Sequence, residues 1–124
     1  ARTRQAEILV EFAQSKSLPI VAVGDYNMDY DFPSKKGNAA FSAIRKGGTF
    51  KWIRPEELVD TNWADADGDG ADDYPNSMLD FTFVAGDAKS WNVIAEVISW
   101  DGDFPDDETT SDHRPILTGI LANE

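Results

Sequence analysis

The sequence predicts one domain of the α+β class, built as an α/β sandwich in which helices cover one β-sheet. Two observations predict this class. A helical pattern over 4–15 leads into the apolar run 19–24, and three later segments arrange apolar residues as strands do. The chain has 124 residues, 41% of them hydrophobic, which suffices for one core. It shows no internal repeat or linker, so we expect 1–124 to form a single domain.

The first half of the chain predicts two helices around one strand. The first helix covers 4–15, with Thr3 as its N-cap, and the run 19–24 reads as a strand buried on both faces because it is β-branched and uninterrupted. A loop over 31–37 follows. Asn38 then caps a short helix that ends at Arg45, whose inward positions are Ala40, Phe41 and Ile44.

The second half predicts loops and three strands. Gly47 and Gly48 break the chain, and Pro55 is placed to begin a helical turn. Polar loops are expected over 65–76 and 101–110. Strands are expected at 78–84, at 91–100, where apolar and polar residues alternate in part, and at 115–121.

Charge and composition limit the function classes. The formal net charge is −12, which repels nucleic acid and anionic membranes unless a metal ion or a local basic patch offsets it. No cysteine is present, which excludes disulfides and thiolate metal sites. No apolar run reaches the roughly 18 residues that a transmembrane helix needs. We expect no transmembrane segment.

Two carboxylates stand out beside strands. Asp25 and Asn27 follow the first strand and are two residues apart, so in extended geometry they share a side, where they suit a water or a metal next to a phosphate. The alternative is an Asx turn at a strand end. Asp80 lies within the apolar strand 78–84 and therefore needs a partner, unless that strand is an exposed edge.

The third polar segment contains the one histidine of the chain. His113 lies between Asp112 and Arg114, just before the last strand. A lone histidine is more often structural than catalytic. A carboxylate on the far side of the ring would fix its tautomer, and Asp80 is the natural candidate, which leaves Asp112 free to bind a hard cation.

Taken together, these segments resemble the endonuclease/exonuclease/phosphatase (DNase I-like) superfamily. Residues 24–27 are similar to its Gly-Asp-aromatic-Asn motif, 79–84 to its Leu-Asp-aromatic-x-Phe-Val strand, and 111–116 to its Ser-Asp-His-x-Pro-Val/Ile motif. The resemblance implies metal-dependent hydrolysis of phosphodiester or phosphate-ester bonds, in a nucleic acid, a lipid or a sugar phosphate. It also implies half of a four-layer fold.

The resemblance also implies roles for single residues. Asp25 orients or deprotonates the attacking water, and Asn27 contacts the phosphate or the metal. Asp112 helps to hold Mg²⁺ (or Mn²⁺), with Asp25 and Asn27 as further ligands. His113 stabilises the transition state or protonates an oxygen, and Asp80 orients it. Which residue is the general base stays open.

The superfamily's first half has no counterpart in this chain. That half supplies an Asn, a metal-binding Glu and a mid-chain His or Tyr, so the chain reads as a C-terminal half. We expect it to be inactive alone. We also expect an uncovered sheet face that either the N-terminal half or self-association would cover.

A second metal site and a basic patch complete the sequence predictions. Asp65, Asp67 and Asp69 are spaced as in a Ca²⁺ loop, with Gly70 at the sharp turn and Asp73 at the ninth position. A solvated acidic turn is the equal alternative, and a non-catalytic calcium-binding or interaction module is the rival function. Lys35 and Lys36 belong to a basic stretch that is a candidate for binding substrate phosphate. The acidic surface and the calcium loop favour a secreted or extracytoplasmic bacterial protein.

Overall fold

The computed structural model describes residues 1–104 and 111–121 and shows a mixed α+β fold, as the sequence predicts. The two helices are α1 (Arg2–Gln14) and α2 (Ala39–Arg45). The strands are β1 (Ile20–Asp31), β2 (Lys36–Gly37), β3 (Phe50–Trp52), β4 (Ser77–Ala85), β5 (Asn92–Val97) and β6 (Ile116–Leu121). Short 3-10 turns η1 (Lys46–Gly48) and η2 (Gly86–Ser90) join some of them. Within the described ranges, no helix is long and apolar enough to cross a membrane.

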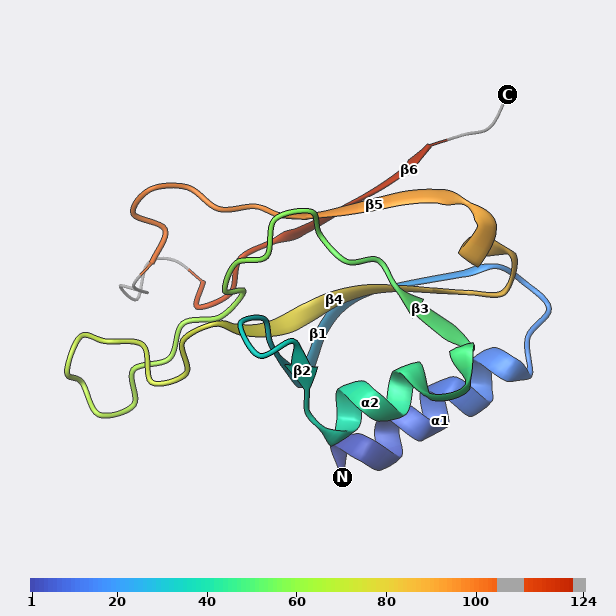
Figure 1. Cartoon of the computed structure of the whole chain (residues 1–124), viewed down its shortest axis with the longest axis horizontal. Coiled ribbons are helices and arrows are strands. Elements are labelled where there is room, and N and C mark those ends of the chain that lie inside the picture. Colours follow the sequence, from blue (N-terminus) through green and yellow to red (C-terminus); the bar gives the residue numbers. More distant parts are fainter. Residues whose placement is uncertain (105–110, 122–124) are drawn as a thin grey trace.

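The strands form two antiparallel groups, which corrects the expectation of a single sheet. In the described part of the chain, four strands pair in the order β2-β1-β4-β3, and β5 pairs with β6 alone. Figure 1 shows α1 and α2 on one side of the four-stranded sheet and the β5–β6 hairpin on the other. The separation has a local cause at η2, where Gly86 has φ +62° and a Cβ would lie 3.1 Å from the Leu18 carbonyl oxygen. Glycine there permits the turn that takes β5 out of the plane of β4.

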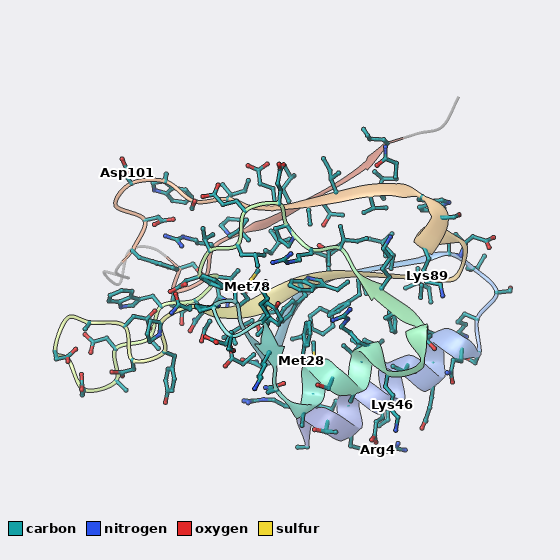
Figure 2. The ribbon with its side chains drawn as sticks, viewed as in Figure 1. Arg4, Met28, Lys46, Met78, Lys89 and Asp101 are labelled. Atoms are coloured by element: carbon teal, nitrogen blue, oxygen red, sulfur yellow. The ribbon has the colours of Figure 1, made fainter. Side chains whose placement is uncertain are left out.

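The main core lies between the helices and the four-stranded sheet. It is aromatic, with Phe41 contacting Trp52 and Phe81 at ring-centroid distances of 5.4 Å and 5.3 Å. Met28 and Met78, labelled in Figure 2, are buried in this cluster, whereas Arg4 is exposed. Tight aromatic packing of this kind fixes the helices against the sheet and holds β1 and β4 rigid.

A smaller core lies between the four-stranded sheet and the hairpin. Val84 is fully buried there and packs with Ile53 and Ala88 against Val93 of β5. The hydroxyls of Thr82 on β4 and Thr118 on β6 are 2.8 Å apart. The face of β4 that carries Asp80, Thr82 and Val84 is thus the face toward the hairpin. Any function of Asp80 must be exercised between these two layers.

Several local predictions needed correction. Helix α1 has Ala1 as its N-cap with no side-chain cap, so Thr3 is inside the helix. Strand β1 runs on to Asp31 and is only partly buried, because the hairpin leaves Val23 47% exposed. The segment after β3 has no helical turn at Pro55. Helix α2 matches the prediction, since the Asn38 side chain accepts a hydrogen bond from the Phe41 amide at 3.0 Å.

Candidate active site

The pairing of β1 with β4 places two carboxylates opposite each other. Asp25 and Asp80 are direct partners in the antiparallel register. Like charges at such a position destabilise a sheet unless something compensates them. Asp80 is buried at 8% exposure, while the Asp25 side chain keeps 39% of its surface exposed. The pair therefore has an inner member and an outer member that solvent reaches.

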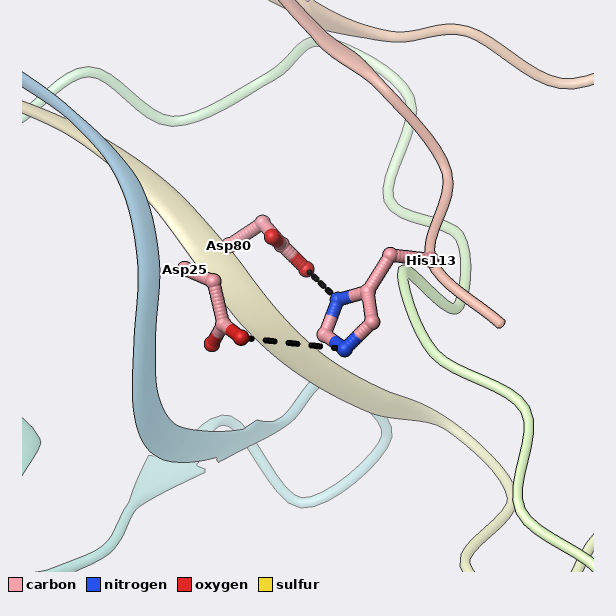
Figure 3. Close-up of side chains that lie close together, drawn as sticks. All are labelled: Asp25, Asp80 and His113. Atoms are coloured by element: carbon pink, nitrogen blue, oxygen red, sulfur yellow. Dashed lines mark hydrogen bonds and ion pairs between the residues drawn. The ribbon is translucent and has the colours of Figure 1, made fainter. Parts of the chain in front are cut away.

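His113 lies between these two carboxylates (Figure 3). Its Nδ1 is 2.8 Å from Asp80 Oδ2, a hydrogen-bond distance. Its Nε2 faces Asp25 Oδ2 at 3.7 Å, which is too long for a direct hydrogen bond but close enough for both atoms to contact one ligand atom placed beside them. The three residues come from β1, β4 and the segment before β6, and the structure brings them together at one place as the sequence predicted.

An extended segment that the sequence analysis did not single out holds the histidine in place. Asn62 forms an antiparallel bridge with His113, and the Trp63 amide donates to the Asp112 carbonyl at 2.9 Å. On the other side, the Arg114 amide donates to the Thr61 carbonyl at 2.9 Å. The backbone on both sides of His113 is therefore fixed by residues more than 40 positions earlier in the chain.

Thr61 links this segment to the carboxylate of Asp80. Its side chain is fully buried, and its Oγ1 accepts a hydrogen bond from the Leu79 amide at 2.8 Å. Burial raises the pKa of the Asp80 carboxyl, and a hydrogen bond from the Thr61 hydroxyl opposes that rise. A threonine in a loop gives no pattern in the sequence, so only the coordinates reveal this role.

Arg114 anchors the other side of the histidine. Its guanidinium makes two hydrogen bonds to the carboxylate of Asp103, at 2.7 Å and 2.8 Å, and a third to the Asp60 carbonyl at 2.8 Å. The Asp103 side chain is only 6% exposed. The hydrogen bonds from Arg114 hold the pKa of Asp103 below its usual range, although burial opposes them. A two-pronged, largely buried pair of this kind fixes geometry as well as charge.

The electrostatics of the site favour a protonated imidazole. Burial of the ring works against protonation, but the hydrogen bond to Asp80 and the charges of Asp80, Asp25 and Asp112 outweigh it and raise the pKa of His113. Burial raises the pKa of Asp80, and the bonds from His113 and Thr61 offset this in part. The two shifts describe one proton-sharing pair, with the imidazolium as the cation between two acidic groups.

Asn27 occupies a bulge rather than regular strand. The β1–β4 register shifts between Asp25 and Tyr30, and Asn27 has φ +50°. Its backbone amide donates to Asp25 Oδ1 at 2.8 Å, so the Asx-turn alternative is present at this strand position. Tyr26 anchors the bulge by packing on Phe83 at 5.3 Å. The Asn27 side chain is left exposed beside Asp25, and Asp25 Oδ2 is left to face His113.

The remaining predicted residues are less closely grouped. Asp112 is exposed and uses its backbone carbonyl to hold Asn62 and Trp63, and its carboxylate is outside the described cluster of potential metal ligands formed by Asp25, Asp80 and His113. Lys35 and Lys36 line a shallow pocket of about 360 Å³ with Arg45. Within residues 1–104 and 111–121, no ion pair links either lysine to the histidine cluster.

The acidic loop forms a second cluster. Asp65, Asp67, Asp69 and Asp73 each offer a carboxylate oxygen within 4.8 Å of the others. Asp65 accepts from the amides of Gly68, Asp69 and Gly70 at 2.8 Å, 3.1 Å and 2.9 Å. The hydrogen bond from the Gly70 amide has the largest effect in lowering the pKa of Asp65, and the bonds from Gly68 and Asp69 add to it. The predicted 101–110 loop lies mostly outside the described residues.

Comparison of the chain with models of protein families, with curated proteins and with solved structures finds no match in any of the three. The chemistry of the site therefore has to be argued from its own residues. An imidazole held by a buried carboxylate on one nitrogen and open toward a second carboxylate on the other can donate a proton, accept one, or stabilise a developing negative charge.

Proposed function

We propose that this chain carries the catalytic histidine half of a metal-dependent phosphoesterase, of the endonuclease/exonuclease/phosphatase (DNase I-like) superfamily. The observation that carries the proposal is the Asp80–His113–Asp25 arrangement, in which a clamped imidazole separates a buried carboxylate from an exposed one. The three motifs of the sequence that resemble the superfamily contain these same three residues.

Each member of the arrangement has a role in the proposed hydrolysis. Asp80 accepts from Nδ1 and keeps the ring oriented. The raised pKa of His113 favours the protonated ring, in which Nε2 can donate toward a phosphate oxygen. Asp25, anchored through Oδ1 to the Asn27 amide, orients or deprotonates the attacking water with Oδ2. Because Asp25 Oδ2 and Nε2 lie 3.7 Å apart, a water or a phosphate oxygen placed beside them could contact both.

The donors at the exposed end suit Mg²⁺ or Mn²⁺. Asp25 Oδ2 and the exposed Asn27 amide are oxygen ligands of the type these ions prefer, and Asp112 could complete them only after its carboxylate turns toward the cluster. The imidazole is unsuitable through Nδ1, since that atom is engaged with Asp80. Such an ion supplies Lewis-acid charge to a phosphate ester.

The proposal also concerns the rest of the fold. We infer that the helices, the four-stranded sheet and the hairpin are the C-terminal half of a four-layer fold. The hairpin exposes Ile94, Leu117 and Leu121. An N-terminal half, or a second copy of this chain, would cover those side chains. The chain alone is proposed to be inactive.

The direct test on this chain uses Mn²⁺ as a paramagnetic probe in NMR. Line broadening is expected first at residues 25–27 and at His113, and Asp25→Asn should remove it there. Broadening confined to the acidic loop would count against the site. The activity test is Mg²⁺-dependent cleavage of bis-p-nitrophenyl phosphate and DNA by a longer polypeptide that contains this chain, with His113→Ala beside the wild type. Equal rates for the two would defeat the mechanism.

A second candidate function is a calcium-binding module without catalysis. The observation that favours it is the convergence of four aspartates in the 65–73 loop. Thermal melting at millimolar Ca²⁺ tests it, because an ion that binds only the folded state raises the melting temperature. Asp65→Asn is the matched variant. A melting temperature that Ca²⁺ does not change would remove the idea, and the histidine site would be unaffected by that result.

A further inference from the structure

One edge of the β5–β6 hairpin faces a groove. The groove measures about 690 Å³ and lies between β5 and the segment that follows β3. Consecutive residues 93–99 line it on the β5 side, so it follows most of the strand. Ile53 and Val59 line it on the other side. It lies apart from the cluster of Asp25, Asp80 and His113, none of which line it.

The backbone of β5 offers unpaired groups to this groove. The Ile98 amide donates to the Pro115 carbonyl at 2.9 Å, in register with the β5–β6 pairs. In an antiparallel ladder such hydrogen-bonded pairs alternate with non-bonded ones. The amides and carbonyls of Val93, Ala95 and Val97 therefore point away from β6. The four-stranded sheet does not pair with them, since within the described residues β5 pairs with β6 alone.

This edge lacks the usual protection against pairing. Exposed edges are commonly blocked by proline, a bulge or an inward-pointing charge. The β5–β6 register is unbroken and β5 contains no proline. The β5 residues that pack inward, Val93, Ala95 and Val97, are apolar, so no charge points inward from this strand. A strand of this length offers about 20 Å of backbone for a further strand.

The charged residues around the groove favour partners of one charge over the other. Glu56, Glu57 and Glu96 line it and are exposed, against the single basic residue Arg54. A second copy of this chain would bring the same acidic groups and a net charge of −12 against them, so self-pairing at this edge is disfavoured. A basic partner is complementary.

We propose that the groove binds an extended peptide segment with alternating apolar and basic side chains, which adds to β5 as a third strand of the hairpin sheet. Its backbone pairs with Val93, Ala95 and Val97, its apolar side chains contact Ile53 and Val59, and its lysines or arginines meet the three glutamates. This is the strand-addition mode of peptide recognition. It is independent of the phosphoesterase proposal.

The test is fluorescence anisotropy with a labelled peptide of alternating valine and lysine, about eight residues long to span the strand. A second peptide carries N-methyl groups on the amides that would face β5, so it keeps the charge and loses the donors. The N-methylated peptide is expected to bind about tenfold more weakly or worse, because lost backbone bonds leave strand groups unpaired. Equal affinity for both peptides would overturn the proposal, since charge alone would then explain binding.

Variants of the chain give the matching control. Ala95→Pro removes an amide that the β5–β6 ladder does not use, and Ala95→Ser keeps it. Binding should be lost in the first and retained in the second. If Ala95→Pro does not fold, amide hydrogen exchange of the wild-type chain is measured instead. The peptide should then slow exchange at the amides of Val93, Ala95 and Val97. Chemical-shift changes confined to the 65–73 loop would contradict the assigned groove.

Discussion

Among residues 1–104 and 111–121, carboxylates cluster in two regions, and their charge is compensated in different ways. In the 65–73 loop, the charge of Asp65 is met by amides of the next few residues. In the histidine cluster, Asp25 and Asp80 carry like charges and face each other. The imidazole of His113, 33 residues after Asp80 in the chain, lies between them and compensates that charge. The hydrogen bonds of Asp65 are local and require only the loop to form. The contacts of His113 with Asp25 and Asp80 form only when β1 and β4 are paired in this register and the 61–63 segment lies beside His113.

The two regions therefore differ in what a mutation should do. Damage to the histidine cluster should lower the stability of the whole fold, because its bonds cross several elements. Damage to the acidic loop should stay within the loop. A series of substitutions tests that difference, beginning with the one that should cost the most stability.

Replacing Arg114 by Ala should have the largest effect. It leaves the Asp103 carboxylate buried without its partner, and breaking a pair of this kind costs about 3 kcal/mol. Chemical denaturation measures the loss. Arg54→Ala, at an exposed position, is the control and should change little. If the Arg114→Ala protein is as stable as the wild type, the ion pair between Arg114 and Asp103 does not contribute to the stability of the fold.

Replacing Thr61 by Val should come next. The shape is retained, but the Leu79 amide and Asp80 each lose a partner, which costs about 1 to 3 kcal/mol of unfolding free energy. Thr61→Ser keeps the hydroxyl and is expected to recover most of the loss. If the serine and valine variants unfold at the same denaturant concentration, Thr61 stabilises the fold through packing rather than through hydrogen bonds.

The pH dependence of stability should be smaller but specific. The pKa of His113 is raised above its ordinary value of 6.5, so its stabilising contribution is fully present below that pH and is lost as the pH rises through the folded-state pKa. The raised pKa of Asp80 acts in the same direction at lower pH, since ionising this buried group opposes folding. Denaturation curves across this range should show the decline, and His113→Gln should flatten its upper part.

Asp65→Asn should have the smallest effect on the fold. Asp65 is only partly buried, and its hydrogen bonds to the amides of Gly68, Asp69 and Gly70 close only the loop. Amide exchange should quicken at Gly68, Asp69 and Gly70 while the melting temperature in the absence of Ca²⁺ hardly changes. A large fall in melting temperature would contradict the view that this cluster is self-contained.

The same contrast explains how much the sequence predicted. Local rules placed helix α2, its Asn38 cap and the acidic loop, because their hydrogen bonds join residues close in the chain. The alternation of residues between the two faces of a strand predicted the positions of β4 and most of β5. The meeting of Asp25, Asp80 and His113 was predicted from motif order and is present in the structure.

Other features depend on contacts distant in sequence. Strand β3 is three residues long and pairs with β4 alone, too short for a pattern to reveal. The bulge at Asn27 depends on register with β4, and the role of Thr61 depends on both Leu79 and Asp80. The separation of the hairpin from the main sheet follows from one turn, η2, whose direction no periodicity encodes.

The most direct measurement is an NMR titration of the two imidazole nitrogens of His113, in the wild type and in Asp80→Asn. The structure predicts a pKa above 6.5 in the wild type, with the Nδ1 proton retained at Asp80 after the ring becomes neutral. The pKa should fall in Asp80→Asn. A wild-type imidazole that titrates at its ordinary value, with no change in the variant, would contradict the account that a buried carboxylate holds this histidine.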